Sequence, residues 1–231
     1  MRVTICFGGS ILVPGTPDLA CIRDIVKTVR ELRSQNHEVL IVVGGGELAR
    51  SYISAAQELG IPGIDQDQIG IAATRLNAQL LIAALGEIAE PAPVTVFEKA
   101  VRAIFRNKVP VMGGTTPGQT TDAVAAMLAQ VSKSEILVFF TNVDGVYTAD
   151  PKVDPKAKKL DRLTPDELAK LVGSAEYKPG MKSVMDPVAV KLIQRSNIKT
   201  LILGRHEITR LPEILNGAKH TGTVIARVSK W

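Results

Sequence analysis

The sequence has few cysteines and few aromatic residues, and each scarcity excludes a class of protein. Its 231 residues include two cysteines, Cys6 and Cys21, which are too few for a fold stapled by disulfides. Aromatic residues make up 4% of the chain, which argues against stacking platforms for single-stranded nucleic acid. Both cysteines lie in apolar or helix-like segments, so we expect buried free thiols and a reducing, cytoplasmic compartment.

Signals for export, membrane insertion and zinc binding are also missing. The N-terminus enters a strand-like segment at Val3, without the charged and apolar regions of a signal peptide. No apolar run reaches transmembrane length. The three histidines, His37, His206 and His220, are isolated along the chain, so we expect neither a zinc cluster nor a Ser-His-Asp triad. Each histidine is expected to be structural or exposed.

The remaining composition fits a soluble globular protein that handles acidic or phosphorylated ligands. Hydrophobic residues make up 45% and charged residues 22%, which is enough to bury a sizeable core. The net charge of +5 favours anionic ligands. Basic residues are mixed with acidic ones, and Asp154 and Asp161 interrupt the densest basic stretch, residues 152–162. A solvated basic face is therefore expected there, and no nucleic-acid surface.

Strand-like and helix-like segments alternate along the chain, which predicts an α/β fold. The predicted architecture is a three-layer sandwich with a mostly parallel central sheet and helices on both faces. Short apolar runs predict strands at residues 3–7, 39–43, 93–96, 109–112, 136–141 and 200–203, with a last strand or hairpin at 222–229. Apolar periodicity predicts helices at residues 18–34, 47–59, 69–85, 97–107, 121–131, 165–172 and 187–196.

No repeat or linker divides the chain, so one domain is expected over residues 1–231. A soft boundary near Leu137 separates an N-terminal lobe, about residues 1–136, from a C-terminal lobe, about residues 137–231.

Glycine-rich loops follow three of the predicted strands, at residues 8–10, 44–46 and 113–115. Parallel α/β sheets bind ligands beyond the carboxyl ends of their strands, so this placement predicts a site. Residues 44–46 precede a helix, whose free N–H groups and dipole favour phosphate, and Arg50 lies one turn into that helix. A plain strand-ending turn explains residues 8–10 equally well, and a tight turn is also an alternative at residues 44–46.

Residues 113–122 read GGTTPGQTTD, a segment rich in small hydrogen-bond donors. It lacks the lysine of a P-loop, so it is not a Walker motif. The threonines and the exposed backbone could line a pocket for a nucleobase or a phosphate. Alternatively, Thr120, Thr121 or Asp122 caps the next helix; the two interpretations are compatible, because both use the N-terminal end of a helix.

Residues 141–151 read TNVDGVYTADP and follow a buried strand. Asp144-Gly145 alone would predict a hairpin turn. An apolar strand that leads into a hydroxyl, an amide, two carboxylates and an aromatic ring is, however, typical of a site loop. Asp144 is expected to orient a catalytic lysine or to bind a metal ion.

Taken together, these motifs resemble the amino-acid kinase family. TNVDGVYTADPK (141–152) resembles the nucleotide loop of the family. Two segments resemble the phosphate loops of the family, GGSILVPG (8–15) and VVGGGELAR (42–50). Two others resemble its phosphate-acceptor segments, DQIGIAATRLNAQLL (67–81) and PVMGGTTPGQTTDAVAA (110–126). VMDPVAVKLI (184–193) is similar to an element of its C-terminal lobe. The form GGTTPGQTTDA resembles the archaeal branch that phosphorylates UMP.

The resemblance implies ATP-dependent phosphorylation of UMP to UDP in pyrimidine nucleotide biosynthesis, with Mg²⁺ accompanying ATP. It also implies a cytoplasmic homohexamer built as a trimer of dimers. The implied ATP contacts are Gly9, Ser10, Gly46, Arg50, Thr141, Asn142, Tyr147 and Asp150. The implied UMP contacts are Gly45, Asp67, Thr115, Thr116, Pro117, Gly118, Gln119, Thr120 and Thr121. The implied catalytic residues are Asp144, Asp186 and Arg50, although a helix cap before Pro187 is an alternative role for Asp186.

One departure from the family concerns the first strand, where many members carry a lysine near the position of Cys6. Here the segment reads Ile-Cys-Phe, so Arg50, Lys182, Lys191 or Mg²⁺ would supply the missing charge. Two alternatives stay open. One is a kinase for another acceptor, such as an acylamino acid, aspartate, carbamate or isopentenyl phosphate, although Asp67 and the threonines favour a nucleotide over a prenyl chain. The other is a non-catalytic nucleotide-binding protein.

Overall fold

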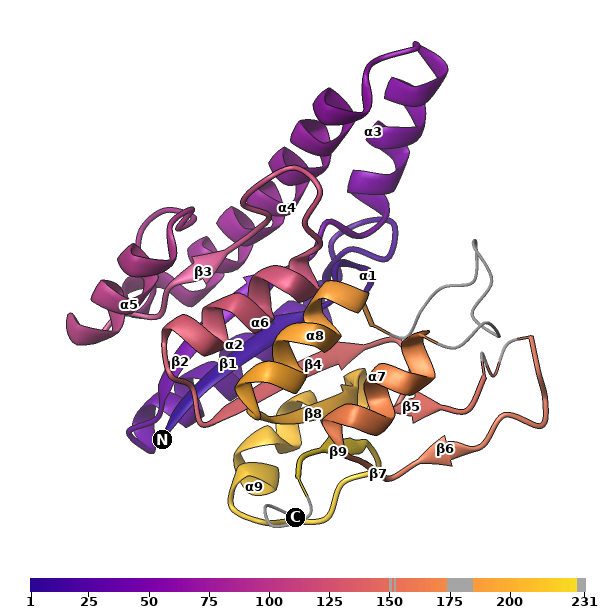
Figure 1. The fold of residues 1–231 in the computed structure, drawn as a ribbon. Helices are drawn as coiled ribbons and strands as arrows, with labels where there is room; N and C mark the ends of the chain where they lie inside the picture. Colours follow the sequence, from indigo (N-terminus) through magenta and orange to yellow (C-terminus); the bar gives the residue numbers. More distant parts are fainter. Residues whose placement is uncertain (150, 152, 174–184, 228–231) are drawn as a thin grey trace.

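The computed structural model describes residues 1–149, 151, 153–173 and 185–227 (Figure 1). Two of the candidate residues, Asp150 and Lys182, lie outside the described residues. A seven-stranded sheet with the order β3-β2-β1-β4-β8-β9-β7 forms the centre. Its strands are β1 (Arg2–Phe7), β2 (Glu38–Val43), β3 (Val111–Met112), β4 (Ile136–Thr141), β7 (Arg162–Leu163), β8 (Lys199–Gly204) and β9 (Thr223–Ile225). All neighbours pair in parallel except β8 and β9, which confirms the mostly parallel sheet.

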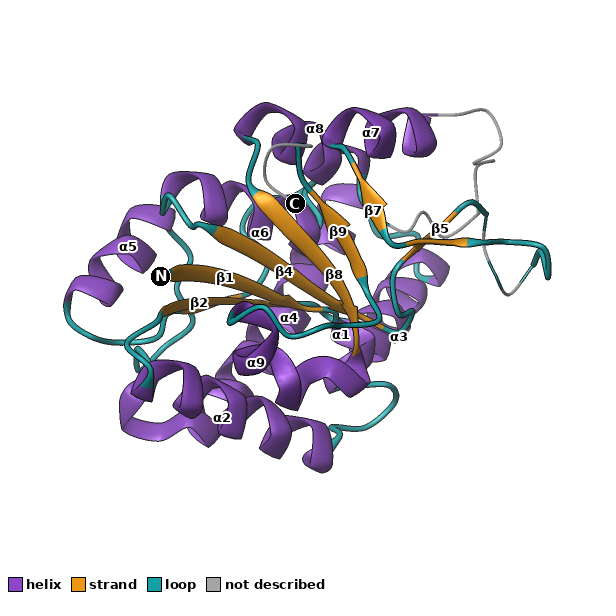
Figure 2. Ribbon diagram, turned by 90° about the horizontal axis from the view of Figure 1, so that it is seen from below, coloured by secondary structure: helices purple, strands orange, loops and turns teal. Residues whose placement is uncertain are grey.

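Helices cover both faces of the sheet, as the alternation of elements predicts (Figure 2). One face packs on α1 (Gly9–Leu12), α2 (Leu19–Ser34), α4 (Gly63–Leu85), the 3₁₀ helix η2 (Arg205–Arg210) and α9 (Leu211–Leu215). The other face packs on α5 (Phe97–Phe105), α6 (Thr121–Val131), α7 (Pro165–Gly173) and α8 (Pro187–Ser196). Outside these layers, α3 (Gly46–Glu58) packs on α4, η1 (Gly86–Ile88) follows α4, and β5 (Val146–Tyr147) pairs with β6 (Lys159–Leu160).

The central strands are buried on both faces, because successive side chains of a strand point to opposite sides. Along β1, Val3, Ile5 and Phe7 belong to the core beneath α2 and α4, whereas Cys6 belongs to the core beneath α6 and α8. The ring of Phe7 stacks on that of Phe140 in β4, with centroids 5.3 Å apart. This packing fixes the ends of β1 and β4 side by side.

Several predicted boundaries are confirmed to the residue, namely those of α6, α8 and β4. Asp18 caps α2, because its side chain accepts a hydrogen bond of 2.9 Å from the Cys21 N–H. The predicted last strand is present as β9, antiparallel to β8.

Other segments differ from the prediction. Helix α4 begins at Gly63, well before residue 69, because its first turns are polar and mostly exposed and so carry no apolar periodicity. Residues 93–96 form only an isolated bridge, from Val94 to Met112, instead of a strand. Local sequence patterns did not predict α1, β5, β6, β7, η2 and α9, which are all short.

Length and composition alone would allow residues Gly63–Ile88 to cross a membrane. Half of the apolar window in this segment is buried inside the protein, however, as in a core helix. The prediction that no apolar run reaches transmembrane length is therefore wrong as a statement about length, although this helix packs within the fold.

Candidate functional site

The glycine loops after β1 and β2 touch each other at the carboxyl edge of the sheet. The Gly8 N–H donates to the Phe140 carbonyl (3.1 Å), and the Gly44 N–H donates to the Phe7 carbonyl (3.0 Å). A Cβ atom on Gly9 would lie 1.9 Å from the backbone nitrogen of Gly46. The close contact of these backbones therefore requires glycine, and the residues 8–10 and 44–46 form one continuous backbone surface at the strand ends.

Asn77, a buried residue of α4, binds the second glycine loop, residues 44–46. Its amide nitrogen donates to the carbonyls of Gly44 (2.9 Å) and Gly45 (3.1 Å). These bonds satisfy both carbonyl oxygens on the protein side of the loop. The sequence did not single out Asn77, because an amide in a mostly apolar helix gives no signal until its partner is known.

A cavity of about 240 Å³ opens beside this loop, between α3, α4 and the segment after β3. Its wall includes Gly45, Asp67 and residues 116–121, all of which were predicted to contact UMP. Thr115 does not line the cavity, but its hydroxyl donates to Gln119 Oε1 (3.2 Å). Residues that are distant in sequence but were predicted to share a ligand are thus brought together.

Three side chains of α4 fix the segment after β3. Asp67 Oδ2 accepts a hydrogen bond from the Gly118 N–H (2.8 Å). Thr74 Oγ1 accepts from the Gly114 N–H (2.7 Å), and Arg75 Nε donates to the Gly114 carbonyl (3.2 Å). Sequence reasoning found Asp67 but missed the positioning roles of Thr74 and Arg75.

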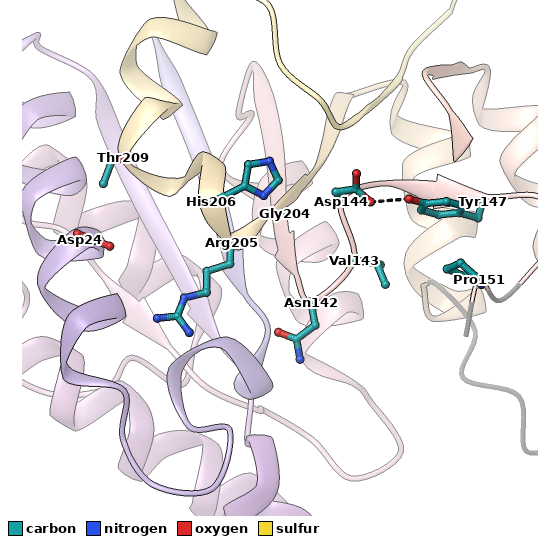
Figure 3. Close-up of a pocket in the computed structure, with 10 residues that line it drawn as sticks. All are labelled: Asp24, Asn142, Val143, Asp144, Tyr147, Pro151, Gly204, Arg205, His206 and Thr209. Carbon is teal, nitrogen blue, oxygen red and sulfur yellow. Dashed lines mark hydrogen bonds between the residues drawn. The ribbon is translucent and has the colours of Figure 1, made fainter. Parts of the chain in front are cut away.

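A larger cavity of about 610 Å³ lies beyond the carboxyl ends of β4 and β8 (Figure 3). The predicted residues Asn142, Asp144 and Tyr147 line it. Thr141 stands at the entrance of the loop, where its hydroxyl donates to the Val143 carbonyl (2.7 Å) and so shapes the turn. The wall also contains residues that were not predicted, namely Asp24, Val143, Pro151, Gly204, Arg205, His206 and Thr209.

Two of the missed residues, Arg205 and His206, directly follow Gly204, the last residue of β8, which was predicted as a strand at residues 200–203. A search of every strand end, including those without glycine-rich loops, would have found them. Arg205 forms an ion pair with Asp18 Oδ2 (2.7 Å). The pKa of Asp18 is lowered, chiefly by the hydrogen bond from the Cys21 N–H and further by Arg205, so that the helix cap also orients a cation on the cavity wall.

Asp144 is the best-connected carboxylate of the larger cavity. Its Oδ1 accepts a hydrogen bond of 2.6 Å from the Tyr147 hydroxyl, and its Oδ2 lies 3.5 Å from Lys159 Nζ. The hydrogen bond from Tyr147 lowers the pKa of Asp144, and the charge of Lys159 acts in the same direction. The carboxylate is therefore ionised at neutral pH, and Lys159 is a lysine that it orients.

Asp186 has the alternative role that was predicted for it, a helix cap, and its catalytic role stays a prediction. Its Oδ1 accepts from the Val188 N–H (2.7 Å) and so caps α8, while its Oδ2 accepts a hydrogen bond from the Thr120 hydroxyl. Thr120 in turn caps α6, because its Oγ1 accepts from the Ala123 N–H (3.2 Å). The N-termini of α6 and α8 are thereby joined next to the smaller cavity.

A thiol and a carboxyl group stand near the position of the missing first-strand lysine. Cys6 Sγ lies 3.8 Å from Asp122 Oδ1. Burial, and then the charge of Asp186, raises the pKa of Asp122 to about 6. Burial, and then Asp122, raises the pKa of the Cys6 thiol well above its ordinary value. Cys6 is therefore a neutral thiol and supplies no charge to a ligand.

Arg50 lies on the surface, away from the walls of both cavities. It is exposed on α3 and pairs with Glu47 Oε2 (2.8 Å), one turn away on the same helix. It lines neither of the two cavities described above. Gly9, Ser10 and Gly46 also lie outside the two cavity walls, in or beside the backbone surface of the glycine loops, and Lys191 is exposed on α8.

Within residues 1–149, 151, 153–173 and 185–227, no three histidine, cysteine, aspartate or glutamate side chains gather into a metal site. The two cavities thus combine backbone N–H groups, hydroxyl groups and scattered single charges. Such an arrangement suits polyanionic ligands that meet at the glycine loops.

The chain matches the model of the Amino acid kinase family over residues 1–204. It is 50% identical to a uridylate kinase of Thermococcus kodakarensis over 225 residues, which cover 97% of this chain and 99% of that protein. It is 46% identical to a uridylate kinase of Archaeoglobus fulgidus over 228 residues, which cover 98% and 100% of the two chains.

Solved structures give the same result for the fold. The crystal structure of uridylate kinase from Archaeoglobus fulgidus matches with a TM-score of 0.86 and 43% identity, covering 98% of this chain and 100% of that chain. The structure of UMP kinase from Bacillus anthracis matches with a TM-score of 0.81 and 25% identity, covering 98% and 96%.

Proposed function

The chain belongs to the amino acid kinase family, and on that premise we propose that it transfers the γ-phosphoryl group of ATP to UMP, forming ADP and UDP. The observation that carries the proposal is the pair of cavities on either side of the contacting glycine loops. Two phosphorylated ligands bound in these cavities would meet over backbone N–H groups. The uridylate kinases that are similar over nearly the whole chain support this choice of substrates.

On this proposal the N-terminal lobe, about residues 1–136, holds UMP. The ligand occupies the smaller cavity, with the phosphate toward Gly45 and the nucleoside against Asp67 and residues 115–121. Asp67 is suited to a ribose, because a carboxylate accepts hydrogen bonds from neighbouring hydroxyl groups. Its present bond to the Gly118 N–H leaves further lone pairs for this purpose.

The C-terminal lobe, about residues 137–231, holds the nucleoside half of ATP in the larger cavity. Asn142 and Tyr147 line this cavity, and Thr141 shapes the loop that carries them. The phosphates extend toward Gly9, Ser10 and Gly46. Arg205 adds a positive charge on the wall, in an orientation set by Asp18.

The reaction needs positioning and charge neutralisation more than proton transfer. The phosphate of UMP is already ionised at neutral pH, so no strong general base is required for in-line attack on the γ-phosphorus. Backbone N–H groups of the glycine loops and the N-terminus of α3 stabilise charge on the transferring group. We propose that Arg50 adds a side-chain cation after rotating away from Glu47, and that Asp186 keeps the N-termini of α6 and α8 together.

Magnesium is proposed to enter with ATP. Kinases bind Mg²⁺ mainly through substrate phosphates and one or two carboxylates, and the ionised Asp144 on the wall of the larger cavity suits that role. When bound, the ion would neutralise charge on the phosphate oxygens.

We further propose a cytoplasmic homohexamer, assembled from dimers, that serves pyrimidine nucleotide biosynthesis. The outer face of α3 and α4 supports self-association, because Tyr52 and Leu76 line one apolar groove there and are each 61% exposed. Such apolar exposure on neighbouring helices is typical of an interface. Light scattering on the purified protein tests the mass, and a Leu76→Asp variant should dissociate if this face joins two copies.

Acceptor specificity tests the proposed function directly. ADP release by the purified protein with Mg·ATP should be fastest with UMP among UMP, CMP, an acylamino acid, aspartate, carbamate and isopentenyl phosphate. Faster turnover of another acceptor would assign a different kinase activity. ATP binding without turnover of any acceptor would indicate a nucleotide-binding protein.

A further inference from the structure

Glu207 is a fully buried carboxylate that follows His206, a residue of the larger cavity wall, and the proposed phosphoryl transfer does not use it. It accepts hydrogen bonds from Arg210 Nη1 (2.7 Å), the Thr221 N–H (2.8 Å) and the Thr221 hydroxyl (2.9 Å). Burial alone would raise the pKa of Glu207, but these hydrogen bonds and the charge of Arg210 outweigh it and lower the pKa. Glu207 is therefore ionised and can only accept hydrogen bonds.

This charge determines the direction of the next hydrogen bond. The Thr221 hydroxyl has one hydrogen, which it donates to Glu207 Oε1. Its oxygen also lies 2.9 Å from Nε2 of His206 and can act there only as an acceptor. The hydrogen-bond chain therefore assigns the hydrogen of the neutral imidazole to Nε2, which leaves a lone pair on Nδ1.

The unprotonated nitrogen lies at the wall of the larger cavity. A Cβ atom on Gly204 would lie 2.9 Å from Nδ1 and 2.8 Å from Cε1 of His206, and 3.2 Å from Cβ of Asp144. The ring thus covers Gly204 on the side that also faces Asp144 (Figure 3). The His206 side chain is 59% exposed, so a ligand can reach it.

The neighbouring wall offers both donors and acceptors. Arg205 provides only donors, each carboxylate oxygen of Asp144 already faces a partner, Tyr147 or Lys159, and Asn142 and Asp24 also line the cavity. Among the described residues, Nδ1 of His206 has no hydrogen-bond partner, and the chain from Glu207 through Thr221 fixes it as an acceptor.

We propose that His206 is a specificity-determining residue, whose Nδ1 accepts a hydrogen bond from the nucleoside half of ATP. Thr221 and Glu207 are positioning residues that fix its tautomer. The donor on the ligand is either a ribose hydroxyl or the amino group of adenine. This inference rests on the proposed function, because it takes ATP as the occupant of the larger cavity.

Two side-chain replacements separate this role from a structural one. An asparagine places its amide near the position of Nδ1, whereas a glutamine reaches the position of Nε2 and can keep the bond to Thr221. We expect His206→Ala and His206→Gln to raise the KM for ATP about 3- to 10-fold, the loss of one neutral hydrogen bond, and His206→Asn to raise it less. The KM for UMP should change less than twofold in all three variants.

A KM for ATP that is preserved in His206→Gln and raised in His206→Asn would overturn the proposal. In that case His206 would act only through its bond to Thr221. A Thr221→Val variant should raise the KM for ATP in the same range as His206→Ala, because it removes the acceptor that fixes the tautomer. An unchanged KM in Thr221→Val would remove Thr221 from the positioning role.

ATP analogues identify the donor. Calorimetric binding of ATP, 2′-deoxy-ATP, 3′-deoxy-ATP and inosine triphosphate to the wild type should show weaker binding of the analogue that lacks the donor. In His206→Ala that difference should disappear. A preference for ATP that is equally strong in both proteins, for every analogue, would contradict a contact with Nδ1.

The tautomer is measured independently of catalysis. ¹⁵N NMR of the imidazole in the ligand-free protein should show hydrogen on Nε2 of His206, and hydrogen on Nδ1 of the neutral ring would overturn the assignment. Turnover of UMP by the wild type tests the proposed function separately. A protein that binds ATP and has the expected tautomer, but fails to phosphorylate UMP, would refute the proposed reaction and retain this inference.

Discussion

Asp67 on α4 accepts a hydrogen bond of 2.8 Å from the backbone N–H of Gly118, across the mouth of the smaller cavity. This bond holds the segment after β3 against α4, and it joins two residues that are 51 positions apart in the chain. The same carboxylate is proposed to accept hydrogen bonds from UMP, so its replacement should affect the loop and the ligand together.

Replacing Asp67 should therefore weaken UMP selectively. We expect Asp67→Ala to raise the KM for UMP about tenfold or more, the loss of a hydrogen bond to a charged acceptor, with little change in the KM for ATP. Asp67→Asn, which keeps one amide oxygen but no charge, should have a smaller effect in the same direction. Steady-state kinetics measure both constants, with Asp65→Ala as a control in the exposed first turn of α4. An unchanged KM for UMP in both Asp67 variants would refute the role.

Arg50 should matter for kinetics and not for stability. Its pair with Glu47 is exposed, and such pairs contribute about 0–1 kcal/mol to the free energy of unfolding. If Arg50 turns toward the transferring phosphate, Arg50→Ala should lower kcat or raise the KM for ATP by about 10²-fold, the loss of one donor to developing charge. Glu47→Ala, which frees the guanidinium, is the matched control and should not lower activity. Wild-type kinetics for both substrates in Arg50→Ala would remove Arg50 from the site.

The carboxyl group of Asp122 should make stability depend on pH. Its pKa is raised from 3.8 to about 6 by burial and by Asp186, so the folded protein favours the protonated form. The stability that this group contributes is thus fully present below about pH 4 and is lost as the pH rises through about 6. Urea denaturation between pH 4 and pH 7.5 should show this loss in the wild type and a flatter profile in Asp122→Asn. Parallel profiles for the two proteins would contradict the raised pKa.

Much of the fold could be predicted because local sequence signals agree with the packing. The cap at Thr120 and the proline after Asp186 mark where α6 and α8 begin, and unbroken apolar runs mark β1, β2 and β4. The contact of the glycine loops at the carboxyl edge of the sheet could be predicted from their positions at strand ends alone. Both cavities contain residues that this reasoning selected.

The missed parts depend on partners that are distant in the sequence. Glu207 is fully buried, although a charged residue within a short polar segment predicts an exposed turn. Its burial becomes possible only because Thr221 and Arg210 satisfy its oxygens. For the same reason His206 seemed isolated, since Thr221 and Asp144, its neighbours in the fold, belong to other segments of the sequence.

The absence of a side chain at Gly204 should matter for ATP binding, because the ring of His206 occupies the place of a Cβ atom. The backbone of Gly204 is extended, with φ −76° and ψ 160°, so an alanine there causes no backbone strain. Its Cβ would nevertheless lie 2.8 Å from the ring of His206, which is too close for ordinary contact.

We expect Gly204→Ala to displace the ring and to raise the KM for ATP about as much as His206→Ala does. Because both changes act on one contact, the double variant should be no worse than the worse single variant, which is non-additive behaviour. Kinetics on the four proteins, with melting temperatures to confirm folding, measure this coupling. Additive losses in the double variant would mean that the alanine acts on the ligand or on Asp144, and that the ring of His206 is not the group it displaces.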